Sequence, residues 1–304
     1  LDGPDSSLLA VVLIVLCLAC LVAEHRVRGR GRYARIGGGT RRRGTPARLG
    51  PARYLVVAGF AGLAVATLGV PIGMIGFWLL QHAQVASSPV IPSLPLLARA
   101  TTATIGFGAA GAAASLLLAL PLGYLATRYH GPWVTLLERT AYLAQGVPGI
   151  VVALALISLT VQAFRPLYQS AALLVITYAI LFLPLALVSV RAAMAQVQRG
   201  LEEAARSLGL GWFAVARRVL LPMAGPGLGA AAAMVFVSVA TELTGTLLLS
   251  PIGTRTLATQ VWANTTSLAF AAAAPFAALM LAISLLSTWL LARRFGVATL
   301  AGGG

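Results

Sequence analysis

Long apolar runs separated by short polar segments dominate the chain from residue 55 onward. Six such runs follow one another, and a shorter seventh run, residues 8–23, precedes them. The six cover residues 55–80, 101–127, 142–162, 168–190, 224–249 and 270–292. As α-helices that rise about 1.5 Å per residue, they are long enough to cross roughly 30 Å of hydrocarbon. The pattern predicts an all-α integral membrane protein with six core helices and one extra N-terminal transmembrane helix.

Composition and charge agree with this class. The chain is 59% hydrophobic and only 10% charged, which is not the composition of a soluble domain. A net charge of +15 suggests a nucleic-acid partner in a soluble protein. Here the basic residues lie between apolar runs, so orientation in the membrane explains them and no nucleic-acid partner is expected. Residues 24–54 hold ten arginines among Gly, Pro and Thr, which predicts a basic linker that contacts anionic membrane lipids.

The distribution of arginines also predicts the topology. If residues 24–54 are cytoplasmic, nine further arginines fall on the same side of the membrane. Only Arg99, Arg165 and Arg255 fall on the other side. Because cytoplasmic loops carry the excess of basic residues, we expect residues 24–54 and 191–222 to be cytoplasmic in this multi-pass protein.

The polar segment 194–222 separates the fourth core run from the fifth and looks built to contact another protein. A short helical pattern begins near Glu202 and Glu203, where acidic side chains suit the positive end of a helix dipole. Arg206 is spaced to pair with either acid on the surface. The segment predicts a helix-turn-helix at the membrane surface.

The turn and the second helix of this motif are also visible. Gly209 supplies a turn that a residue with a Cβ would strain. A second amphipathic pattern covers residues 212–220, and Pro222 then fits the first turn of the next helix, where its missing N–H costs nothing.

The spacing of residues in this segment resembles the EAA signature of the permeases of ABC importers. The matching positions are Glu203, Ala204, Ala205, Gly209, Leu221 and Pro222. The resemblance implies a MetI-like fold in a bacterial inner membrane, with this segment as a coupling helix that docks into a cytoplasmic ATPase dimer. The ATPase would use the ATP, so this chain is expected to be no enzyme and to have no catalytic residue and no cofactor. An extracytoplasmic solute-binding protein would deliver the substrate.

Three further segments, residues 142–151, 178–185 and 242–251, resemble the ferric-iron branch of these permeases. The substrate implied is ferric iron, with thiamine, a polyamine or an anion as alternatives. In that branch a basic residue commonly precedes the Phe-Leu-Pro segment, whereas Leu181 stands here. A secondary transporter driven by an ion gradient is the alternative class. Such proteins usually carry several ionisable groups within the membrane, and in the later runs only Glu242 qualifies.

Candidate residues for the substrate path are Glu242, Pro148, Gly149 and Pro184. Acids within a membrane are costly and usually functional, but a Glu that hydrogen-bonds Thr241 or Thr244 needs no substrate. The proline and glycine breaks can line a pathway with exposed carbonyls or can be packing irregularities.

Other polar and small residues have simpler interpretations. Glu138 is expected to pair with the adjacent Arg139, and the three histidines are far apart, so no metal site is predicted. Small residues at 106–111 and at 225, 227 and 229 are expected to let neighbouring helices approach closely.

The resemblance covers residues 55–296, one complete six-span permease unit. In the ferric-iron and thiamine branches two such units are often fused in one chain. We therefore expect residues 1–23 to be the end of a preceding permease unit, 24–54 the cytoplasmic linker and 55–304 the permease domain. A second permease unit, fused or separate, is an expected partner.

Overall fold

A computed structural model describes residues 50, 52–81, 92–129, 131–291 and 293. The predicted first span, residues 8–23, and nearly all of the linker 24–54 lie outside these residues. The chain divides into two units, Leu1–Ala58 and Gly59–Gly304. The described part of the first unit consists of Gly50 and the opening turns of one helix, and the rest of the description concerns the second unit.

The described residues are helical, with loops between the helices, and include five helical segments long and apolar enough to cross a membrane. This result confirms the all-α class. The five are α2 (Ala52–Ala64) with its continuation η1 (Val65–Gly69) and α3 (Val70–Leu80), then α4 (Leu94–Arg128), α7 (Ala171–Ala195), the segment Trp212–Ala240, and α13 (Phe270–Leu291).

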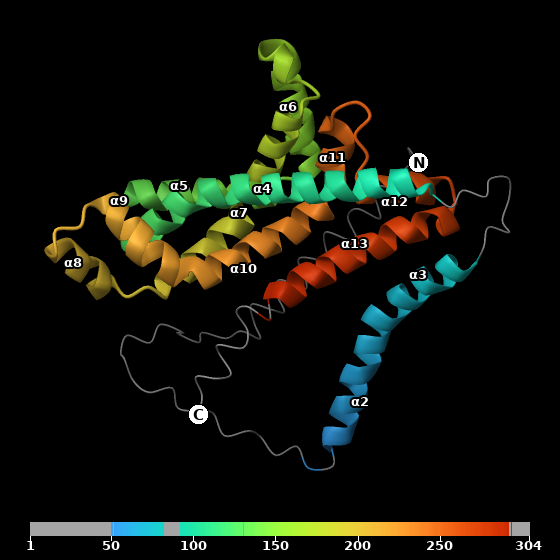
Figure 1. Cartoon of the computed structure of the whole chain (residues 1–304), viewed down its shortest axis with the longest axis horizontal. Coiled ribbons are helices and arrows are strands. Elements are labelled where there is room, and N and C mark those ends of the chain that lie inside the picture. Colours follow the sequence, from blue (N-terminus) through green and yellow to red (C-terminus); the bar gives the residue numbers. More distant parts are fainter. Residues whose placement is uncertain (1–49, 51, 82–91, 130, 292, 294–304) are drawn as a thin grey trace, which may run out of the picture. The chain divides into compact units, whose positions relative to one another are not determined.

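The third predicted core run is not one span. It divides into α5 (Pro132–Gly146) and α6 (Gly149–Ala163), which are 15 residues each, and η2 (Arg165–Leu167) follows α6. Val147 and Pro148 between them are extended, with ψ angles of 124° and 136°. Because the proline ring disfavours the helical region for the residue before it, Val147 ends the first helix. In Figure 1, α6 projects away from the bundle of α4, α7 and α10.

The fifth predicted run is also interrupted. Its main helix, α10 (Leu221–Ala240), ends before Thr241, and a second short helix, α11 (Thr244–Leu249), follows the break. A loop then leads to α12 (Leu257–Thr266), whose first turn is closed by a capping box between Thr256 and Thr259.

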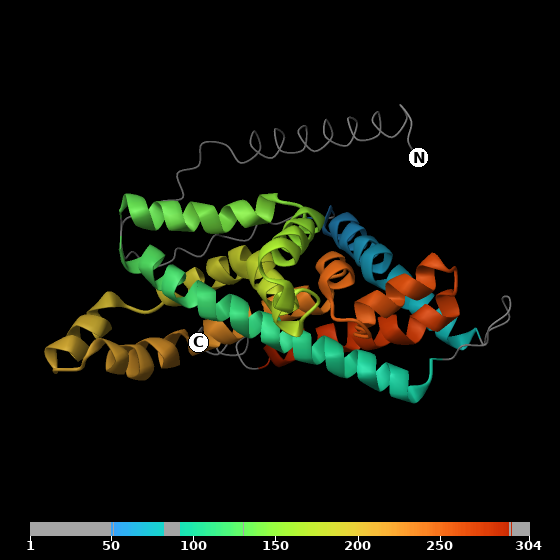
Figure 2. The same cartoon turned by 90° about the horizontal axis from the view of Figure 1, so that it is seen from above.

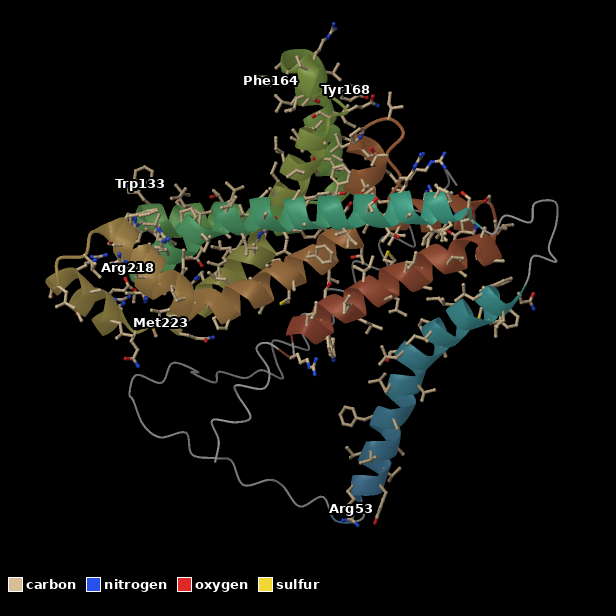
Figure 3. The ribbon with its side chains drawn as sticks, in the orientation of Figure 1. Arg53, Trp133, Phe164, Tyr168, Arg218 and Met223 are labelled. Atoms are coloured by element: carbon tan, nitrogen blue, oxygen red, sulfur yellow. The ribbon has the colours of Figure 1, made fainter. Side chains whose placement is uncertain are left out.

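The core of the second unit lies where α4, α7 and α10 pack together (Figures 1 and 2). Its largest fully buried side chains include Tyr178, Leu173, Leu187 and Val235. A smaller apolar cluster joins the start of α4 to α12 and α13 through Ala100, Leu257 and Phe276. The large apolar side chains outside these clusters face outward, as expected of a protein surrounded by lipid. Figure 3 shows two of these, Phe164 and Tyr168, at the far end of α6.

Glycines allow the closest approaches between these helices, as the small residues predicted. A Cβ at Gly111 would lie 3.0 Å from the Cβ of Tyr178, and a Cβ at Gly123 would lie 2.7 Å from a methyl group of Val190. At Gly227 the added Cβ would lie 2.5 Å from the Cβ of Ala193 and 3.1 Å from its Cα. Gly106 and Gly225, for which a close approach was also predicted, face open space instead.

This difference generates a prediction about two of these glycines. Gly227→Ala should destabilise the protein by about 1–3 kcal/mol, because the new methyl group meets backbone that cannot move aside. Gly106→Ala, the matched control in α4, should be neutral or slightly stabilising, because its methyl group meets no atom and alanine is the better helix former. Thermal unfolding of the detergent-solubilised variants measures both, and equal midpoints would contradict the packing of α10 on α7.

Candidate functional site

The segment after α7 folds into one surface helix followed by a sharp turn. This helix, α8 (Arg199–Ser207), confirms the first predicted helix of the motif. Gly209 has a φ of +82°, and no atom lies within 4 Å of a Cβ placed there. Glycine is therefore required here by the backbone conformation and not by lack of space. This is the turn that was predicted at Gly209.

The second helix of the predicted helix-turn-helix is not a separate helix. The short helix α9 (Trp212–Val215) and the π-helical turn η3 (Ala216–Leu220) continue without interruption into α10. The N–H of Leu221 donates to the carbonyl of Ala216, five residues earlier. This wider turn accommodates Pro222, which has no N–H and whose ring would clash with the carbonyl four residues earlier. Trp212–Ala240 is thus one helical segment of 29 residues, and its first turns form the second arm of the motif.

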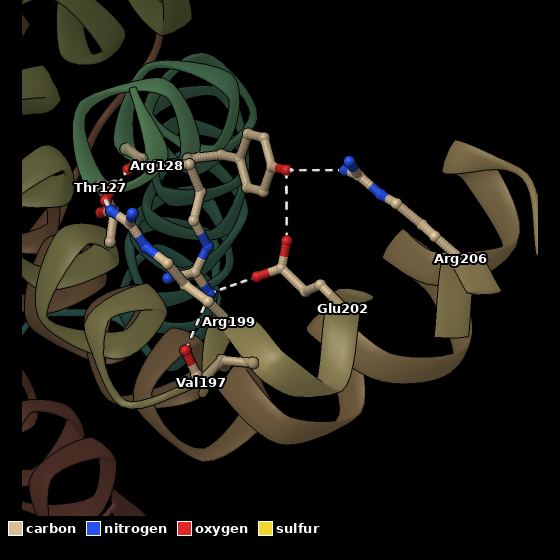
Figure 4. A network of polar contacts seen from close by, with 8 residues as sticks. Thr127, Arg128, Val197, Arg199, Glu202 and Arg206 are labelled. Carbon is tan, nitrogen blue, oxygen red and sulfur yellow. Dashed lines mark hydrogen bonds and ion pairs between the residues drawn. The ribbon is translucent and has the colours of Figure 1, made fainter. Parts of the chain in front are cut away.

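Glu202 anchors α8 to the end of α4. Its side chain is buried and forms an ion pair with Arg128, the last residue of α4 (Figure 4). Arg128 also donates to the carbonyl of Val197 over 2.9 Å, and the Tyr124 hydroxyl donates to the Glu202 carboxylate over 3.3 Å. Arg199 donates to the carbonyl of Thr127 over 2.9 Å. The unpaired carbonyls at the end of α4 make this a favourable place for two arginines.

Arg206 was predicted to pair with Glu202 or Glu203 on the surface, and that prediction is wrong. Glu202 turns inward to Arg128, and the Arg206 guanidinium instead donates to the hydroxyl of Tyr124 over 3.4 Å. It also lies over the ring of Trp212, at 5.9 Å from the ring centre. Arg206 therefore links α8 to α4 and α9.

The six signature residues divide between two faces of this segment. Ala205 is buried, whereas Glu203, Ala204 and Gly209 are exposed. Leu221 and Pro222 are also exposed, at the start of α10. Because Glu202 and Ala205 hold the inner face of α8, its outer face presents Glu203 and Ala204 in a fixed orientation.

A second site lies at the break between α10 and α11. Both carboxylate oxygens of Glu242 accept backbone N–H groups, from Thr244 and Gly245 at Oε1 and from Gly245 and Thr246 at Oε2, over 3.0–3.3 Å. The Thr246 hydroxyl lies 2.8 Å from the Glu242 carbonyl oxygen and 2.7 Å from the buried Tyr178 hydroxyl. Glu242 thus caps α11. Of the two threonines named beforehand, Thr244 is a partner through its backbone N–H, and the Thr246 hydroxyl also donates to Oε2 over 3.3 Å.

Only some of the predicted substrate-path residues gather at this break. Gly149, the first residue of α6, lies so close that a Cβ there would be 3.8 Å from Glu242 Oε1. Pro148 precedes it as the N-terminal cap residue of α6, and is exposed. Pro184 is buried inside α7, three residues after Leu181, whose side chain also lies beside Gly149. No group of three or more metal-ligating side chains occurs among the described residues.

Sequence reasoning missed several polar residues of both sites. Arg128 and Tyr124 are distant in sequence from the surface helix. Tyr178 is a single aromatic residue within an apolar run, and nothing in its sequence neighbourhood indicates a polar contact. Glu138 pairs with Arg191 of α7, not with the adjacent Arg139 as predicted. On an α-helix, neighbours in sequence point in different directions, so the pair that forms is set by which helix lies opposite.

This geometry generates a prediction about the buried ion pair. Glu202→Gln should lower stability by about 3–5 kcal/mol, because it leaves Arg128 buried without a counter-charge. Thermal unfolding in detergent measures the change.

The matched control is Glu203→Gln, at the exposed neighbouring position, which should change the midpoint little. Replacing both Arg128 and Glu202 by Met should recover much of the loss, since no unpaired charge then remains. Equal effects of the two Glu→Gln changes would contradict the inward position of Glu202.

Comparison with known proteins gives two kinds of match. The family model of the binding-protein-dependent transport system inner membrane component matches residues 119–295. The Fe(3+)-transport system permease protein FbpB 2 of Haemophilus influenzae is 31% identical over 291 residues, which are 95% of this chain. The chain spans 57% of the length of that relative.

Solved structures share the fold at low identity. An inward-facing structure of the MetNI methionine ABC transporter covers 68% of this chain and 98% of its own, with a TM-score of 0.53 and 21% identity. A bacterial ABC transporter involved in the import of the polysaccharide alginate covers 79% of this chain and 95% of its own, with a TM-score of 0.58 and 15% identity. At these identities the likeness concerns the fold alone.

Proposed function

The chain belongs to the family of binding-protein-dependent transport system inner membrane components, and on that premise we propose that it carries ferric iron in an ATP-driven importer. As a member it is a multi-pass inner-membrane permease component and not an enzyme. The proposal that the substrate is ferric iron rests on the relative named as an Fe(3+) permease, which is 31% identical over 95% of this chain. Thiamine, a polyamine or an anion are the alternatives to iron.

The proposed partners follow from the same premise. A cytoplasmic ATPase dimer would use the ATP, and an extracytoplasmic solute-binding protein would deliver the ion. A second permease unit would complete the pathway, fused to this one or separate. The chain's share of its relative's length, 57%, leaves room for such a unit.

The outer face of α8 is the proposed docking surface for the ATPase. Glu203 and Ala204 are exposed there, Gly209 is exposed in the turn that follows, and the small alanine side chain leaves backbone accessible to a partner's groove. The Arg128–Glu202 pair would transmit a movement of α8 to α4. The uninterrupted segment Trp212–Ala240 would transmit it to α10, so a rigid-body shift at the surface reaches the core helices.

In the substrate path, Glu242 is proposed as a positioning residue. Its two oxygens are already engaged by backbone N–H groups of α11, so a passing ion would have to displace them. The carboxylate instead keeps α11 beside the start of α6, where Pro148 is the cap residue and Gly149 the first residue of the helix. Pro184, in the neighbouring α7, is proposed to belong to the same path.

The docking proposal generates a prediction at two exposed positions. Gly209→Pro should uncouple uptake from ATP hydrolysis, because proline cannot adopt a φ of +82°. Ala204→Trp should do the same by obstructing the partner, while its unfolding midpoint stays unchanged. ATP-driven uptake and hydrolysis in proteoliposomes measure both effects.

The control is Ala172→Trp, at an alanine that is also exposed and lies at the start of α7, and it should leave coupling intact. Normal coupling in the Ala204 variant would count against this docking surface.

The substrate proposal is tested by uptake of radiolabelled ferric iron with the cognate binding protein. Ferric iron should enter only with ATP, and unlabelled thiamine or spermidine should not compete. Glu242→Gln should lower the maximal rate of uptake with little change in KM, since it weakens the cap of α11 without removing a ligand of the ion. A large rise in KM at unchanged stability would place the carboxylate in contact with the ion. Transport of another substrate alone would reject iron.

A further inference from the structure

An apolar cavity of about 500 Å³ opens beside the surface helix. It lies between the end of α4, the end of α7 and the first turns of Trp212–Ala240. Its apolar lining includes Leu120, Leu125, Met194 and Leu220, and it also includes the aromatic rings of Tyr124 and Trp212. This volume falls in the range of about 300–1,000 Å³ that small-molecule sites occupy.

With residues 191–222 on the predicted cytoplasmic side, the cavity would lie at the depth where acyl chains meet lipid headgroups. Arg128 ends α4, and Leu120 precedes it by eight residues, or about 12 Å of helix. Trp212 and Tyr129, at the cavity wall, are each about half exposed. Trp and Tyr concentrate at the membrane–water interface because their rings have an apolar body and a polar edge.

The guanidinium of Arg206 adds a positive charge beside two residues of the cavity lining. The Glu202 carboxylate is paired with Arg128, so its charge is not available to Arg206. The described contacts of the Arg206 guanidinium are with two neutral groups, the Tyr124 hydroxyl and the Trp212 ring, and both belong to the cavity lining. Arg206 is exposed and can bind an anion with two parallel N–H groups.

We propose that this cavity binds an anionic phospholipid of the inner leaflet, with an acyl chain among the leucines and the phosphate on Arg206. An apolar cavity, an aromatic rim and an arginine at headgroup depth are the features that such a ligand requires. The bound lipid would bridge α4 and the Trp212–Ala240 segment beside the proposed docking helix. The proposal rests on the predicted cytoplasmic side of residues 191–222, and not on the identity of the substrate.

Quenching of Trp212 fluorescence tests the site directly. The full-length protein is reconstituted in nanodiscs with phosphatidylglycerol or phosphatidylcholine that carries bromine on its acyl chains, and the Trp212 signal is the difference from a Trp212→Phe variant. Brominated phosphatidylglycerol should quench this signal more strongly at equal mole fraction. Arg206→Gln should reduce the preference about fivefold, the effect of one basic side chain at the membrane surface. Ala216→Leu, which fills the cavity, should reduce quenching by both lipids.

Arg217→Gln is the matched control, because it removes one charge from an exposed arginine of the same segment. It should keep the preference. If it lowers the preference as much as Arg206→Gln does, general surface attraction explains the result and the site is rejected. Absence of quenching by either lipid would show that protein, such as a second permease unit, covers the cavity, and would also reject it. Binding is read without transport, so a failure here is distinct from a failure of the docking proposal.

Discussion

The buried ion pair between Arg128 and Glu202 determines where the surface helix lies. It joins the last residue of the longest described helix to the first turn of α8, and the arginine also binds the carbonyl of Val197. A buried pair of this kind adds little net stability, because both charges must lose their water. Its consequence is orientation: only one rotation of α8 satisfies Arg128, and that rotation turns Glu203 and Ala204 outward.

Prolines shape the helices in two different ways. Pro71 and Pro222 each follow a π-helical turn, η1 and η3, and the surrounding helix continues past them. The wider turn removes the clash between the proline ring and the carbonyl four residues earlier. Pro148 acts differently, because the residue before it is extended and the helix ends. The break at Pro148 lies beside the break at Glu242. The start of α6 and the start of α11 are therefore both next to the Glu242 carboxylate.

Much of the surface motif was predictable from spacing alone. The turn at Gly209 and the helix around Glu203 depend on residues close in sequence, and local rules describe them well. The partner of Glu202 was not predictable in this way. Tyr124, which donates to the same carboxylate, lies 78 residues earlier in the chain, and no periodicity links the two. The same reason explains why Glu138 pairs with Arg191 and not with Arg139.

The all-helical class and most of the membrane-length helices follow from the amino-acid order, because burying backbone polar groups in lipid leaves few alternatives to long apolar helices. The folded arrangement decided which acid is buried and which is exposed, and which glycines touch a neighbour. These outcomes depend on contacts between helices distant along the chain, and such contacts exist only once the helices have packed.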